Sequence, residues 1–178
     1  MGPRSLGLSI RPARDEDCEV LSAIYQESLD AKDSCMELES TPQKFRDMME
    51  HFHQREVLLV VEDDGVVRGW GTVKRYSDRP GYRVACETSI YFSRSCTGRG
   101  YGGRLQKELI ERARCFGYHH IVTKIWTSNL GSLRFHERFG FKTVGVQKEI
   151  GYLGGAWRDV TIMQLILDDV PPYRPEAG

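Results

Sequence analysis

The sequence predicts a single α+β domain in which a central, twisted, mixed β-sheet of six or seven strands carries helices on both faces. Two amphipathic helical segments come early, a β-meander follows, and two strand–helix units come late. Because the chain has 178 residues, one domain accommodates it. We expect this domain to span residues 1–170 and the proline-rich residues 171–178 to form a disordered tail.

The N-terminal part contains one strand and two helices. Residues 8–13 have strand character, and Asp15 is positioned to cap a helix that runs to Leu29. Thr41 and Pro42 form a good N-cap and first-turn pair for the second helix. The apolar stripes that these two helices would bury comprise Val20, Leu21, Ile24, Leu29, Phe45, Met48, Met49 and Phe52.

The middle of the chain has the pattern of a meander. Residues 57–62 and 66–75 flank the turn Asp63-Asp64-Gly65, which predicts a β-hairpin. Residues 83–93 form a further strand and 103–116 a helix. The inward positions of that helix would be Leu105, Leu109, Ile110 and Ala113.

The C-terminal part predicts a strand, a helix and a last hairpin. The strand covers residues 121–126, and Ser128 or Asn129 caps the helix, which ends near residues 139–140. Residues 141–150 and 157–167 form the hairpin around Gly154-Gly155.

Composition narrows the functional classes. Lys and Arg total 25 and so do Asp and Glu, which argues against a nucleic acid or an anionic membrane as a partner. The N-terminus lacks the apolar core of a signal peptide. Five widely spaced cysteines without a Cys-x-x-Cys motif indicate reduced thiols and no metal site. We therefore expect a cytoplasmic protein.

Residues 90–103 are the most informative stretch. A strand rich in β-branched and aromatic residues leads into four glycines that open a helix. Uncovered N–H groups and the helix dipole favour anions at such a terminus, so the stretch predicts a phosphate-bearing ligand.

The glycine spacing alone does not identify that ligand. Gly98-x-Gly100-x-x-Gly103 matches a dinucleotide fingerprint, which requires an acidic residue about 20 positions later to hold the ribose. No acidic residue lies between Arg112 and His136, and a Gly-Lys-Ser/Thr phosphate loop is absent. The remaining candidate is a long, thin ligand that carries a diphosphate.

Two motifs resemble the Gcn5-related N-acetyltransferase superfamily. Thr97-Gly98-Arg99-Gly100-Tyr101-Gly102 has the spacing of its acetyl-CoA loop, although Thr97 stands where Gln or Arg is usual. About 30 residues later, the segment from Asn129 through His136-Glu137 to Gly140-Phe141 is similar to its second motif.

Within the superfamily, the sequence is most similar to phosphinothricin, methionine sulfone and L-amino acid N-acetyltransferases. The similarity rests on Glu87-x-Ser89-x-Tyr91, His136 and Gly155-x-Trp157-x-Asp159-Val160. It implies transfer of the acetyl group of acetyl-CoA to the amine of a small amino acid by direct attack, and a homodimer. Leu38-Glu39 stands where herbicide-detoxifying relatives carry Phe-Arg, which argues against phosphinothricin itself.

The resemblance also implies the roles of individual residues. Glu87 would be the general base. Alternation places it on one face with Ser89 and Tyr91, and a carboxylate in such an apolar strand is costly unless it has a partner or a function. His136 would exchange protons with the amine or the thiolate. Apart from the resemblance, Arg75, Arg79, Tyr82 and Arg83 precede Glu87 and could hold an acidic group, because Arg binds carboxylates in a bidentate way; of these, Arg75 and Tyr82 are expected to bind the acceptor. Residues expected to bind acetyl-CoA are Ile90, Tyr91, Phe92, Gly98, Arg99, Gly100, Tyr101, Gly102, Gly103 and Asn129.

Three alternatives remain at this point. The acceptor could be the amine of a protein N-terminus or a lysine. The protein could be a non-catalytic sensor that binds acyl-CoA. A dinucleotide-dependent oxidoreductase is the least supported, because the ribose acid is missing.

Overall fold

The computed structural model describes residues 7–33, 39–96 and 98–174. Seven strands form one sheet in the order β1-β2-β3-β4-β5-β7-β6, and only the β4–β5 pair is parallel. The strands are β1 (Ser9–Pro12), β2 (Val57–Asp63), β3 (Val66–Arg75), β4 (Ala85–Phe92), β5 (His120–Trp126), β6 (Lys142–Leu153) and β7 (Ala156–Ile166). The α-helices are α1 (Cys18–Asp30), α2 (Pro42–Glu50), α3 (Tyr101–Cys115) and α4 (Leu130–Glu137).

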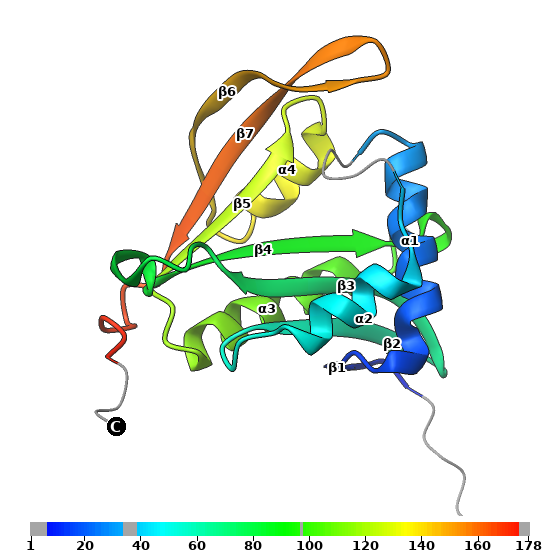
Figure 1. Cartoon of the computed structure of the whole chain (residues 1–178), viewed down its shortest axis with the longest axis horizontal. Helices are drawn as coiled ribbons and strands as arrows, with labels where there is room; N and C mark the ends of the chain where they lie inside the picture. Colours follow the sequence, from blue (N-terminus) through cyan, green and yellow to red (C-terminus); the bar gives the residue numbers. More distant parts are fainter. Residues whose placement is uncertain (1–6, 34–38, 97, 175–178) are drawn as a thin grey trace, which may run out of the picture.

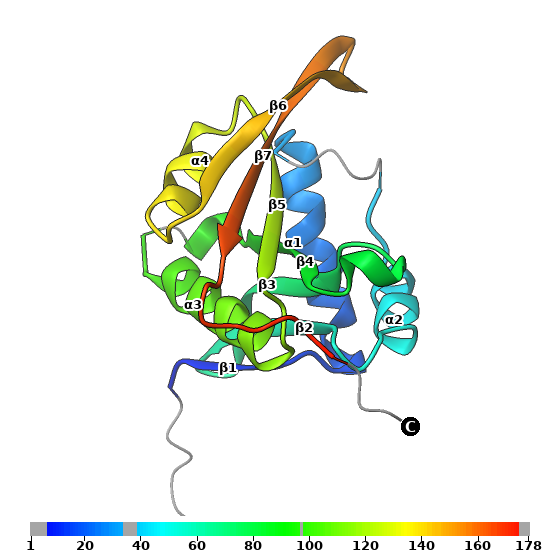
Figure 2. The same ribbon diagram turned by 90° about the vertical axis from the view of Figure 1, so that its left-hand side faces the viewer.

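Helices cover both faces of the sheet, which confirms the predicted fold class. Helices α1 and α2 lie on one face, and α3 and α4 lie on the other (Figures 1 and 2). Each face has its own apolar core: Leu58, Val60 and Trp70 pack with α1 and α2, while Leu59 and Val61 pack with α3. Alternation along β2 therefore supplies both cores from one strand.

Both hairpins turn at the residues that the sequence predicts. Asp64 and Gly65 have φ of 51° and 78°, and Gly154 and Gly155 have φ of 61° and 77°. Positive φ at both central residues gives the turn whose twist matches that of the flanking strands. The β6–β7 hairpin projects beyond the rest of the molecule (Figures 1 and 2).

The start of α1 differs from the prediction. Residues 15–17 form a 3₁₀ turn, so Asp15 does not cap the helix. The buried Asp17 organises this corner instead, because it accepts hydrogen bonds from the Arg14 N–H at 2.7 Å and from both terminal nitrogens of Arg11. Burial opposes the charge of Asp17, but these donors outweigh it and lower the pKa of the carboxyl.

The start of α2 agrees with the prediction. The Thr41 side chain accepts a hydrogen bond from the Lys44 N–H, and Pro42 occupies the first turn. Within the described ranges, no helix has both the length and the apolar character that a membrane crossing requires.

The parallel pairing of β4 with β5 is short. Ala85, Cys86 and Glu87 pair with residues 120–122, and the ladder then ends. Strand β4 continues to Phe92 against β3, while β5 continues to Trp126 against β7. The two strands therefore diverge into a wedge (Figure 1).

Part of the predicted tail packs against the domain. The Tyr173 ring lies over the buried Arg55, with the ring centroid 3.6 Å from the guanidinium carbon. The backbone carbonyl of Tyr173 accepts a hydrogen bond from Arg83 Nε at 3.0 Å. Residues 175–178 lie outside the described ranges.

Gly71 gives a test of the packing between β3, β4 and α3. A Cβ at this position would lie 2.8 Å from the Ser89 carbonyl oxygen and 2.8 Å from a Leu109 methyl carbon. We expect Gly71→Ala to lower the free energy of unfolding by about 1–3 kcal/mol in urea denaturation, because the backbone of β4 cannot yield cheaply. Gly145→Ala is the control, since its Cβ would meet open space. Equal stability of the two variants would contradict this account of the packing.

Candidate functional site

The glycine loop presents uncovered backbone donors. Gly98 and Gly100 have φ of 82° and 77°, and Gly100 is the N-cap of α3. The Arg104 N–H donates to the Gly100 carbonyl and is the first N–H bonded within the helix, so the N–H groups of residues 101–103 have no acceptor inside it. Their shared direction and the helix dipole favour a bound anion.

A cavity of about 480 Å³ lies next to this loop, within the wedge between β4 and β5. We call it the wedge cleft. Beyond the pairs that end at Glu87, the β5-facing edge of β4 has no neighbouring strand among the described residues. The predicted residues that line the wedge cleft are Ile90, Tyr91, Phe92, Gly98, Gly100, Tyr101, Gly102, Asn129 and His136.

His136 is buried on α4 and faces this cleft. Its Nδ1–H donates to the Ser132 carbonyl at 2.8 Å, which leaves the Nε2 lone pair unprotonated. Burial lowers the pKa of His136, although the bond to Ser132 favours the protonated form. The imidazole is therefore a neutral proton acceptor at neutral pH.

Asn129 has a structural function that the sequence also indicated. Its Oδ1 accepts from the Ser132 N–H at 3.1 Å and caps α4. The side chain still lines the wedge cleft, so its amide group is near any ligand held there.

A second, larger cavity of about 850 Å³ opens on the face that α1 and α2 cover. We call it the α2 cleft, because α2 and the ends of β3 and β4 enclose it. Glu87 lines it, and three residues line both cavities: Ser89, Tyr91 and Lys124. A ligand in one cavity therefore meets a ligand in the other beside Glu87. Among the described residues, no group of three potential His, Cys, Asp or Glu ligands could hold a metal ion.

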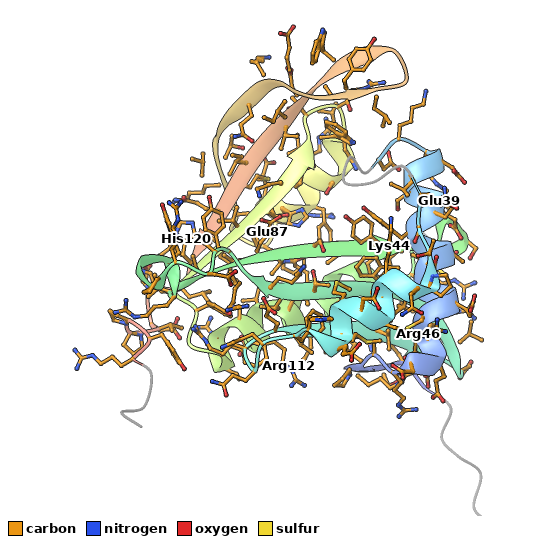
Figure 3. The ribbon with its side chains drawn as sticks, in the orientation of Figure 1. Glu39, Lys44, Arg46, Glu87, Arg112 and His120 are labelled. Carbon is orange, nitrogen blue, oxygen red and sulfur yellow. The ribbon has the colours of Figure 1, made fainter. Side chains whose placement is uncertain are left out.

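Glu87 lies where β4 and β5 begin to diverge (Figure 3). Its Oε2 is 2.8 Å from the Nζ of Lys124, and the side chain is 25% exposed. The predicted base thus sits at the junction of the two clefts and holds a cationic amine.

The predicted acceptor residues are placed differently. Arg75 lines the α2 cleft, but its guanidinium pairs with Glu56 and Asp78. Tyr82 is exposed and is not among the residues that line this cleft, but its ring makes an edge-to-face contact with Tyr76, which does line it. Both assignments stay predictions, with Arg75 the better placed.

Other residues predicted for the site lie at its margin or outside the described residues. Arg99 is exposed, and neither it nor Gly103 is among the residues that line the wedge cleft. Gly103 contributes its N–H at the start of α3. Thr97 and Leu38 lie outside the described residues.

Sequence reasoning missed two lysines. Lys74 pairs directly with Glu87 in the β3–β4 ladder, which places both side chains on one face, and both line the α2 cleft. Lys124 reaches Glu87 from β5. Alternation with Trp70 and Thr72 could have indicated Lys74, whereas the contact of Lys124 depends on the β4–β5 register.

Comparisons with known proteins agree with this geometry. The family model described as "Acetyltransferase (GNAT) family" matches residues 21–141. The L-amino acid N-acyltransferase MnaT of Escherichia coli is 31% identical over 166 residues, which cover 91% of this chain and 95% of that protein. An L-methionine sulfoximine/L-methionine sulfone acetyltransferase of Salmonella typhimurium is 30% identical, with 91% and 96% covered.

A solved structure shows the same fold with the donor bound. The GNAT superfamily phosphinothricin acetyltransferase of Sinorhizobium meliloti, in complex with acetyl-CoA, superposes with a TM-score of 0.83 at 26% identity. The superposition covers 96% of this chain and 94% of that one.

The chain belongs to the acetyltransferase (GNAT) family. It is an acetyl-CoA-dependent N-acetyltransferase, as the two motifs predicted. The residues of the wedge cleft fit this donor: the N–H groups at the start of α3 suit its pyrophosphate, and the open edge of β4 suits its amide-bearing arm.

The glycine loop gives a test of donor binding with a matched control. Gly65 and Gly100 have nearly the same φ, and a Cβ on either meets open space. Alanine at either position should cost about 1 kcal/mol of stability through backbone strain. Only Gly100→Ala should weaken CoA binding, by roughly tenfold in titration calorimetry, because it displaces the N–H groups of α3. Equal affinity in both variants would exclude the loop as the pyrophosphate site.

Proposed function

We propose that the enzyme acetylates the primary amine of a small amino acid or amino-acid analogue, of the methionine sulfone, methionine sulfoximine or phosphinothricin type. The position of Glu87 carries this proposal, since it faces the α2 cleft at the junction with the wedge cleft. The names of the relatives support the class of acceptor.

Glu87 would prepare the amine for attack. An amino acid enters as an ammonium and must lose a proton before its nitrogen attacks the thioester. Glu87 accepts that proton, directly or through one water, within a ternary complex of enzyme, donor and acceptor. The amine then attacks the thioester directly, so no acyl-enzyme forms. The unprotonated Nε2 of His136 would accept a proton or a hydrogen bond on the donor side.

Charge in the α2 cleft matches the other end of an amino acid. Lys74 faces the cleft beside Glu87 and has no ion pair among the described residues. An acceptor carboxylate could pair with it while the ammonium meets Glu87. The arrangement suits a zwitterion, so we expect an amino-acid carboxamide to have a higher KM than the free acid. Glu39 lies before α2 and argues against phosphinothricin as the preferred acceptor.

The decisive experiment compares two carboxylate variants in a thiol-release assay with amino acids, methionine sulfone and phosphinothricin. Glu87→Gln should lower kcat by roughly 10²–10⁴-fold and leave CoA affinity unchanged, because only the proton acceptor is lost. Glu137→Gln, at an exposed position on α4, should retain full activity.

Two outcomes would contradict the proposal. Tight CoA binding without turnover of any amine would indicate a sensor. Turnover of peptide amines alone would indicate a protein acceptor.

We also propose that the enzyme is a cytoplasmic homodimer that needs no nucleic acid or membrane. The described cysteines Cys18, Cys86, Cys96 and Cys115 are all free thiols, which suits a reducing compartment. Tyr152 and Trp157 are 63% and 62% exposed on the projecting β6–β7 hairpin, with ring centroids 5.0 Å apart. Such a surface is costly to leave in water, so a second copy would cover it.

Light scattering after size exclusion tests this assembly. Trp157→Glu should convert the dimer to a monomer, because it places a charge in the proposed interface. Val66→Glu, at an exposed apolar residue of the β2–β3 hairpin, should leave the dimer intact. A monomeric parent protein, or equal effects of both changes, would overturn the proposed interface.

A further inference from the structure

Lys124 has an unusual position for a surface lysine. It lies two residues beyond Val122, where the pairing with Glu87 ends, so its side chain emerges on the same sheet face as Glu87. It lines both the wedge cleft and the α2 cleft. Of the three residues that line both cavities, it alone carries an amine.

The contacts of this amine are those that an acceptor needs. An acceptor ammonium must approach the Glu87 carboxylate within hydrogen-bonding distance before it can lose its proton. The Lys124 Nζ already lies 2.8 Å from Oε2 of Glu87. The Lys124 side chain is 43% exposed, and the Tyr76 ring centroid lies 5.9 Å from the same nitrogen. A primary amine of the chain therefore occupies the place proposed for the substrate amine.

We propose that Lys124 is a self-acetylation site, modified by acetyl-CoA in the enzyme's own wedge cleft. Glu87 takes one proton from the ammonium, and the freed nitrogen attacks the thioester carbonyl. The N–C bond forms, the C–S bond breaks, and the leaving thiolate takes up the second proton that the nitrogen loses, which gives CoA. The product is an N-acetylated lysine, and no other reactant is required. This inference rests on the proposed function, since it uses the same donor and the same base.

The modification would depend on whether an acceptor is present. An acceptor ammonium competes with Lys124 for Glu87, so bound acceptor protects the lysine. Acetylation removes the positive charge, which breaks the ion pair with Glu87 and places an amide at the junction of the clefts. The acetylated enzyme would thus accumulate when donor is abundant and acceptor is scarce.

Two lysine variants separate self-acetylation from general lysine reactivity. Lys124→Arg keeps a cation beside Glu87, but a guanidinium remains protonated and cannot attack. Lys142→Arg is the control, since Lys142 is exposed on β6 and is not among the residues that line either cleft. Retained CoA binding shows that each variant is folded.

The experiment incubates the full-length protein with acetyl-CoA and no acceptor, and follows it by intact-mass and peptide mass spectrometry. We expect one acetyl group on Lys124, at an unchanged rate in Lys142→Arg. The intact-mass addition should be lost in Lys124→Arg and slowed roughly a hundredfold in Glu87→Gln. An acceptor that the enzyme turns over should suppress it.

Acetylation spread evenly over the cleft lysines, or unaffected by Glu87→Gln, would overturn the proposal as chemical background. No acetylation of Lys124 while amino acids are turned over would also overturn it and leave the proposed function intact. Failure of the proposed function itself has a different signature, which is the absence of thiol release with every amine.

Discussion

The short parallel pairing between β4 and β5 is the constraint on which the site depends. Three residue pairs join the strands, and each strand then follows a different neighbour for its remaining length, β3 for β4 and β7 for β5. On the sides away from the wedge, β4 pairs with β3 from Cys86 to Phe92 and β5 pairs with β7 from His120 to Trp126, so these pairings hold the two strands apart. The exposed backbone of β4, the start of α3 and the buried imidazole of α4 all border this one opening.

The same divergence explains why donor and acceptor chemistry can meet. Residues of β4 alternate between faces, so Glu87 turns toward the α2 cleft while the strand's open edge borders the wedge cleft. Ser89, Tyr91 and Lys124 connect the two cavities. The paired charges of Glu87 and Lys124 favour acceptors that carry charges of their own. A lysine in this place makes the enzyme's own amine the first competitor of its acceptor.

Local signals in the sequence were sufficient for the elements of the fold. Periodicity predicted the helices, and Asp-Gly and Gly-Gly predicted the two hairpins that positive φ values confirm. The predicted cap of α1 was wrong. The buried Asp17 accepts the hydrogen bonds of Arg11 and of the Arg14 N–H, while Asp15 faces solvent. The pairing of Arg75 with Glu56, and of Lys124 with Glu87 across 37 residues, depends on strand register. No local pattern encodes such a register, so these contacts required the structure.

Backbone hydrogen exchange, followed with and without CoA, tests whether the wedge between β4 and β5 holds the donor. Bound CoA should slow exchange in residues 88–92 of β4 and at the start of α3, near Tyr101, with little change along α2. Protection confined to the α2 cleft, or absent from β4, would contradict this placement of the donor.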